Sequence, residues 1–65
     1  MSKEQNVVLN WMKRISKMLK LEQVLYHLSC TDSVTEEVRQ AYAKLNEFEK
    51  YQVIHAFSLW GMEQA

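Results

Sequence analysis

The 65-residue chain contains no proline and a single glycine, Gly61. Tight turns depend on these two residue types, so their scarcity argues against a β-sandwich, a β-barrel or another loop-rich scaffold. There is also only one cysteine, Cys30, which excludes the intrachain disulfide framework that staples many small secreted domains. These shortages together predict a helical protein that works in a reducing, cytoplasmic setting.

Long apolar runs are missing as well. The longest early run, residues 7–9, is too short for the apolar core of a signal peptide. Nothing in the chain approaches the ~20 apolar residues that span a bilayer. We therefore expect neither a secretory leader nor a membrane partner.

The composition that remains is that of a folded protein, with 48% hydrophobic and 25% charged residues. The length suits one domain, residues 1–65, with a thin core. Small domains without disulfides or metals often gain stability by oligomerising or by docking on a larger partner. We therefore expect a homo-oligomer, most simply a homodimer.

Apolar residues recur at helical spacing in four segments, which predicts an all-α bundle of three or four short helices. The expected bounds are about 3–20, 21–30, 34–45 and 47–61. Most of the seven aromatic residues fall on inner stripes and are expected in the core. The inner positions predicted for the first two segments are Val8, Trp11, Met12, Ile15, Met18, Leu19, Leu21, Val24, Leu25 and Leu28.

The boundary between the first two segments leaves two alternatives. The apolar stripe changes phase at Leu21, yet no glycine, proline or N-cap residue marks a break. One helix over residues 3–30 would be ~42 Å long, whereas a compact chain of this size has a radius of gyration of ~11 Å and a diameter of roughly 28 Å. The length favours a kink around 19–21 over one continuous helix that protrudes.

Two N-terminal capping boxes are predicted for the later helices, one formed by Ser33 with Glu36 and one by Asn46 with Glu49. The last segment is apolar nearly all round, which is typical of a helix that is central or covered from outside the chain. Gly61 is expected to end this helix, and Leu59, Trp60 and Met62 are expected to lie in an interface between chains.

The charges are balanced overall but separated along the chain. Residues 1–20 hold five basic residues and one acidic residue, a net charge of +4, and residues 21–65 hold three basic and seven acidic residues, a net charge of −4. A basic amphipathic helix is typical of a surface for an acidic protein partner, nucleic acid or a membrane, and the alternative is that its basic residues only form a solvated face. The residues expected to bind the partner from one face of the first helix are Lys13, Arg14, Lys17 and Lys20.

Residues 21–45 fit a DNA-binding helix-turn-helix only loosely. The supposed recognition helix would open with Glu36 and Glu37, which repel phosphates. The sequence therefore favours a small protein-interaction or regulatory module, with the partner unidentified. Its alternative is a DNA-binding transcriptional regulator that uses the basic face of the first helix.

Residues that could carry chemistry are few. His27, Cys30 and His55 are the only histidine and cysteine residues, whereas a structural zinc site needs four ligands. A catalytic cysteine would need an oxyanion hole, and the chain has no glycine-rich turn to build one. No phosphate-binding, dinucleotide or metalloprotease motif occurs. We expect no catalytic residues, no metal and no cofactor, so the chain is not expected to be an enzyme.

We predict that the purified protein holds no stoichiometric metal, because three scattered ligands cannot complete a tetrahedral site. A chelator should leave the melting temperature unchanged. Elemental analysis that finds one zinc ion per chain would contradict this prediction and reopen the possibility of an enzyme.

Overall fold

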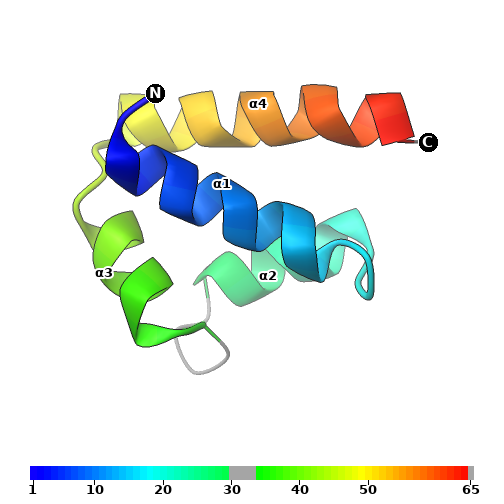
Figure 1. The fold of residues 1–65 in the computed structure, drawn as a ribbon, viewed down its shortest axis with the longest axis horizontal. Helices are drawn as coiled ribbons and strands as arrows, with labels where there is room; N and C mark the ends of the chain where they lie inside the picture. The colour runs from blue at the N-terminus through cyan, green and yellow to red at the C-terminus, as the bar shows by residue number, and fades with distance from the viewer. Residues whose placement is uncertain (30–33, 65) are drawn as a thin grey trace.

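Four helices make up the fold of the computed structural model, which describes residues 1–29 and 34–64. The helices are α1 (Lys3–Ile15), α2 (Leu21–Ser29), α3 (Glu36–Ala43) and α4 (Glu47–Gln64) (Figure 1). The predicted all-α bundle is therefore confirmed. The radius of gyration is 10.9 Å and the longest dimension is 30 Å, in agreement with the expected size.

The helix N-termini are fixed by side chains that bond the first free backbone amides. Ser2 and Gln5 form a reciprocal capping box at the start of α1. Asn46 and Glu49 do the same for α4, through hydrogen bonds of 2.8 and 3.0 Å, as the sequence predicts. The prediction for α3 is wrong, because Thr35 is the N-cap and its hydroxyl accepts a hydrogen bond from the Val38 amide. Ser33 lies outside the described residues.

The chain does break between α1 and α2, but earlier than predicted. The first helix ends at Ile15 instead of residue 20. The Ser16 hydroxyl donates a 2.8 Å hydrogen bond to the Lys13 carbonyl, and the amides of Met18 and Leu19 both bond the Ile15 carbonyl. Serine side chains that bond the backbone in this way compete with the helical ladder. A polar residue thus ends α1, with no glycine or proline involved.

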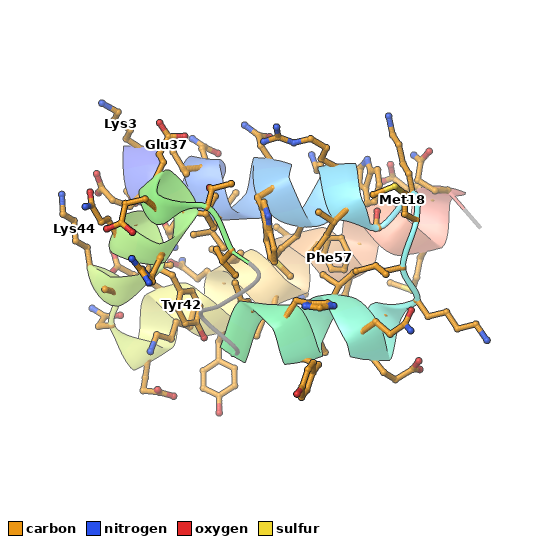
Figure 2. The ribbon with its side chains drawn as sticks, turned by 90° about the horizontal axis from the view of Figure 1, so that it is seen from below. Lys3, Met18, Glu37, Tyr42, Lys44 and Phe57 are labelled. Carbon is orange, nitrogen blue, oxygen red and sulfur yellow. The ribbon has the colours of Figure 1, made fainter. Side chains whose placement is uncertain are left out.

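Helix α1 is the centre of the packing, because it contacts both α3 and α4. Its Val8 and Met12 side chains are fully buried, with no exposed surface. Figure 2 shows Phe57 of α4 in the interior of the molecule and Met18 at its periphery. The buried apolar residues are Val8, Leu9, Trp11, Met12, Val24, Leu28, Val38, Ala41, Leu45, Val53 and Phe57.

Several residues predicted for the core lie outside it. Met18 is 82% exposed and Leu21 is 53% exposed. The position of Met18 depends on a helix that continues past Ile15, and the turn over residues 16–20 removes it from the inner stripe. Leu21 is the first residue of α2 and keeps about half of its surface in solvent there. Among the seven aromatic residues, Tyr26, Phe48 and Tyr51 are exposed. The other four, Trp11, Tyr42, Phe57 and Trp60, are buried in the core or packed against it, as expected for most of them.

One polar side chain sits in the core and ties α1 to α4. Gln5 is buried, its Oε1 accepts a 2.8 Å hydrogen bond from the Ser2 amide, and its Nε2 donates to the Glu49 carbonyl and to Gln52 Oε1. All the hydrogen-bonding groups of this amide are therefore used, which is what its burial requires. Because the partners are 44 and 47 residues away in sequence, Gln5 fixes the register of α1 against α4.

Gln5→Ala should lower the free energy of unfolding by about 1–3 kcal/mol, because it removes buried hydrogen bonds and the N-terminal capping box. Gln40→Ala is the matched control, since the Gln40 amide donates only to Glu36 on the exposed surface. We expect a change within about 0.5 kcal/mol for the control. Urea denaturation measures both, and equal effects would contradict the role of Gln5.

Gly61 lies inside α4 and does not end it, so the predicted stop is wrong. The helix continues to Gln64, and no described residue has a positive φ. A glycine ends a helix by adopting the left-handed conformation, and Gly61 does not adopt it. A Cβ atom built at this position meets no atom within 4 Å.

Gly61→Ala should therefore raise the free energy of unfolding by about 0.5–1 kcal/mol, since alanine has the higher helix propensity and fits the existing backbone. In a domain this small, each kcal/mol shifts the melting temperature by about 4–8 °C. Thermal unfolding followed by circular dichroism measures the shift. A lower melting temperature would indicate that Gly61 has the left-handed backbone of a helix stop.

Candidate protein-binding groove

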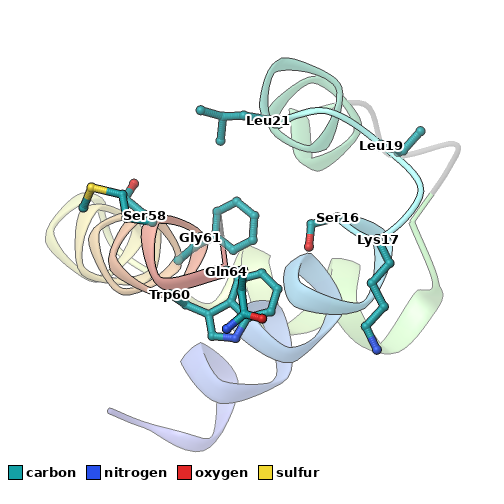
Figure 3. A pocket seen from close by; sticks show the side chains of 10 residues that line it. Ser16, Lys17, Leu19, Leu21, Ser58, Trp60, Gly61 and Gln64 are labelled. Atoms are coloured by element: carbon teal, nitrogen blue, oxygen red, sulfur yellow. The ribbon is translucent and has the colours of Figure 1, made fainter.

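An apolar groove of about 550 Å³ lies where the chain turns from α1 to α2 and faces the last turns of α4. In Figure 3, Leu21 extends from the start of α2 toward α4, and Trp60 extends from α4 toward α1. Volumes of this size are within the range of sites that take a ligand or a few side chains. The lining residues are Ser16, Lys17, Leu19, Leu21, Phe57, Ser58, Trp60, Gly61, Met62 and Gln64.

The groove results from unequal helix lengths. Helix α1 ends at Ile15, whereas α4 continues to Gln64. Leu21 opens α2 directly after the turn over residues 16–20 and keeps 53% of its surface in solvent, although the sequence predicts it for the inner stripe of the second helix. The groove is therefore bordered by residues from distant parts of the sequence.

Two stacked aromatic rings belong to the lining of the groove. The ring centroids of Phe57 and Trp60 are 5.8 Å apart, with an interplanar angle of 26°. Phe57 is buried, and Trp60 is partly buried. The Lys13 ammonium nitrogen lies 5.7 Å from the Trp60 ring centroid, which is within the range of a cation–π contact. This contact brings a positive charge to the edge of an apolar surface.

The predicted basic residues gather around the end of α1 but do not share one helix face. Lys13 and Arg14 occupy the last turn of α1, whereas Lys17 and Lys20 follow it in the turn. The predicted single face is wrong, because the helix that would align the four side chains ends at Ile15. Of the four, only Lys17 lines the groove, and Lys13 approaches it through Trp60.

These four cations have no carboxylate partner among the described residues. The salt bridge that the described ranges contain joins Arg39 to Glu36 on α3. Arg14, Lys17 and Lys20 are also exposed. Their charges are therefore available to a ligand at the groove end of the molecule.

The three residues predicted for an interface are divided between two surfaces. Trp60 and Met62 line the groove, while Leu59 does not and is 47% exposed on another side of α4. Sequence reasoning missed Leu21 and Phe57 as groove residues, because it placed both in the core. Their sequence separation leaves no local signal that could pair them.

The histidine and cysteine residues are not brought together as far as the structure describes them. Within residues 1–29 and 34–64, no group of three His, Cys, Asp or Glu side chains is arranged to hold a metal ion. His27 packs edge-on against Tyr26, and its buried Nδ1 has no hydrogen-bond partner within the same ranges. Cys30 lies outside them, so the metal-free protein stays a prediction.

Comparisons with protein-family models, curated proteins and solved structures give no significant match to this chain. In the part of the chain that the structure describes, none of the helices combines the length and the apolar character needed to cross a bilayer.

Proposed function

We propose that this chain is a small non-catalytic protein-interaction module that binds another protein through the groove. The observation that carries the proposal is an apolar groove with stacked Phe57 and Trp60 in its lining and, beside it, cations that have no carboxylate partner among the described residues. Aromatic side chains in partly desolvated pockets supply most of the affinity in many protein interfaces. The single cysteine supports a cytoplasmic location.

The chemistry of the groove favours a partner segment that is both apolar and acidic. Leu21, Trp60 and Met62 offer apolar surface for the anchoring side chains of a partner helix. Lys17 in the lining and Lys13 over Trp60 would attract carboxylates that flank those anchors. Such complementarity raises the association rate and selects against basic partners.

The lining also supports a binding role over catalysis. Among the described residues that line it, none is a histidine, a cysteine or a carboxylate, the side chains that most often act as acids, bases or nucleophiles. Two serines, Ser16 and Ser58, are present, but the Ser16 hydroxyl already donates to the Lys13 carbonyl and that of Ser58 to the Ile54 carbonyl. Neither is paired with a base.

A DNA-binding regulator remains the second candidate, because the same cations could contact phosphates. One observation disfavours it. The −4 net charge of residues 21–65 opposes DNA at longer range. We also propose that the chain self-associates, as the apolar surplus of α4 predicts.

Charge reversal tests the groove. Lys17→Glu/Lys20→Glu should weaken capture of a cellular protein partner, measured by pulldown with quantitative mass spectrometry. Lys3→Glu/Lys44→Glu is the matched control, because it changes the net charge equally at exposed positions elsewhere. Leu21→Asp places a charge on the apolar side of the same groove, so it should abolish capture of the partner. Equal capture by all variants would contradict the proposal.

The same variants separate protein binding from DNA binding. We predict no gel shift with duplex DNA at physiological salt and micromolar protein. Binding by about four cations would give a log–log salt dependence with a slope near −3 to −4. A salt-sensitive shift that is lost in Lys17→Glu/Lys20→Glu and kept in Lys3→Glu/Lys44→Glu would establish the DNA-binding alternative.

A further inference from the structure

Helix α4 has a second apolar face that no described helix covers. Figure 1 shows α4 along one edge of the molecule, with α1 on its inner side. At 100° per residue, five side chains fall within roughly 80° of one another on the opposite side from buried Val53 and Phe57. We call them the outer stripe: Phe48, Tyr51, His55, Leu59 and Met62.

The outer stripe is well exposed along its whole length. The exposed fractions are 70% for Phe48, 68% for Tyr51, 47% for Leu59 and 66% for Met62. An exposed helix face normally carries charged residues. Residues 51–62 contain no Asp, Glu, Lys or Arg. This face therefore lacks the charges that keep an exposed helix in water.

The spacing of the outer stripe is symmetric about His55. Phe48 and Met62 lie seven residues to either side of it, and Tyr51 and Leu59 lie four residues to either side. When two copies of such a helix pack antiparallel, each position meets its mirror position. Phe48 then faces Met62 of the second copy, Tyr51 faces Leu59, and the two His55 rings meet at the axis.

We propose that the outer stripe is a homodimer interface in which α4 packs antiparallel against α4 of a second copy, across a two-fold axis at His55. The proposal deepens the self-association proposed above and names its surface. A two-fold interface uses the same patch on both subunits and must be complementary to itself. The mirror spacing of the stripe meets that requirement.

The available area reaches what a specific dimer needs. Large side chains contribute about 150–250 Å² each when fully covered, so the exposed parts of the stripe amount to roughly 500 Å² per copy. Two copies together would bury about 1,000 Å², the least that a biological interface needs and less than the roughly 1,200–2,000 Å² of tight ones. We therefore expect dissociation in the micromolar range.

Charge favours a second copy as the occupant of this face. The neutral stripe meets itself without repulsion, whereas the groove would bring Lys17 and Lys13 of two copies together. Trp60 projects toward α1 and lies on the groove side of α4. The predicted interface of Leu59, Trp60 and Met62 is thereby revised, with Trp60 assigned to the groove.

Sedimentation equilibrium at tens of micromolar should show a dimer for the unmodified chain. Leu59→Glu and His55→Lys should give monomers, because each places two like charges within the interface. His55→Leu should instead tighten the dimer by roughly tenfold or more. Circular dichroism should show all three variants folded, since both positions are exposed.

Two variants are the controls and should stay dimeric. Leu21→Glu changes the groove, and Asn10→Glu changes an exposed position of α1. If the stripe variants stay dimeric and Leu21→Glu becomes monomeric, the outer stripe is not the dimer interface. That result would overturn the proposed interface, while the proposal that the chain self-associates would stand. A monomer for the unmodified chain would overturn both. Partner capture through the groove is measured separately, so its failure is distinguishable from either result.

Cross-linking tests the antiparallel register. In a Cys30→Ser background, Phe48→Cys and Met62→Cys chains are mixed and oxidised. The antiparallel dimer should give mainly a mixed disulfide between the two variants, because those positions face each other. Homodisulfides of each variant alone would indicate a parallel arrangement, and either that result or the absence of cross-links would overturn the proposal.

Discussion

The packing of α1 against α3 and α4 is the constraint on which the rest of the structure depends. Val8 and Met12 have no exposed surface, so they are enclosed on every side by the other helices. Removing a buried methionine side chain typically costs 2–5 kcal/mol, a large part of the 5–15 kcal/mol that stabilises most domains. A chain with one thin core has few other sources of stability, so it could not compensate for a buried amide without hydrogen-bond partners. The buried Gln5 is accordingly hydrogen-bonded through both its oxygen and its nitrogen.

Because a single helix forms the centre, the other helices need only one apolar face each. Helix α4 contributes Val53 and Phe57 to the core that it shares with α1, yet its sequence is apolar on the other side as well. The surplus cannot be explained by the fold of one chain. It is separated into two surfaces of different charge, a groove bordered by cations and a neutral outer stripe. The charge difference is why we assign the groove to an acidic protein and the stripe to a second copy.

The sequence predicted some of the features that depend on neighbouring residues. The capping box of Asn46 and Glu49 is predicted correctly because its two residues are only three positions apart. The equally local cap of α3 is not, since Thr35 takes the place of Ser33. The end of α1 was placed five residues late, since a serine that bonds the backbone leaves weaker sequence evidence than glycine or proline. Once Ile15 ends the helix, the spacing argument no longer applies to Met18, and this predicted core position is exposed. Leu21 lies in the predicted second helix, but as the first residue of α2 it is exposed as well. The groove could not be predicted, because Leu21 and Phe57 meet only through the tertiary fold.

Met62 connects the two proposed surfaces. It lines the groove and also ends the outer stripe, with 66% of its surface exposed. A second copy that packs on the stripe would cover Met62 with Phe48. Binding at one surface then changes the area of Met62 available at the other, and such a coupling must act equally in both directions. Methionine suits this position because its flexible, polarisable side chain adapts to different neighbours. The short α1 is what leaves the groove open, so the residue that both proposed surfaces share stays accessible in a single chain.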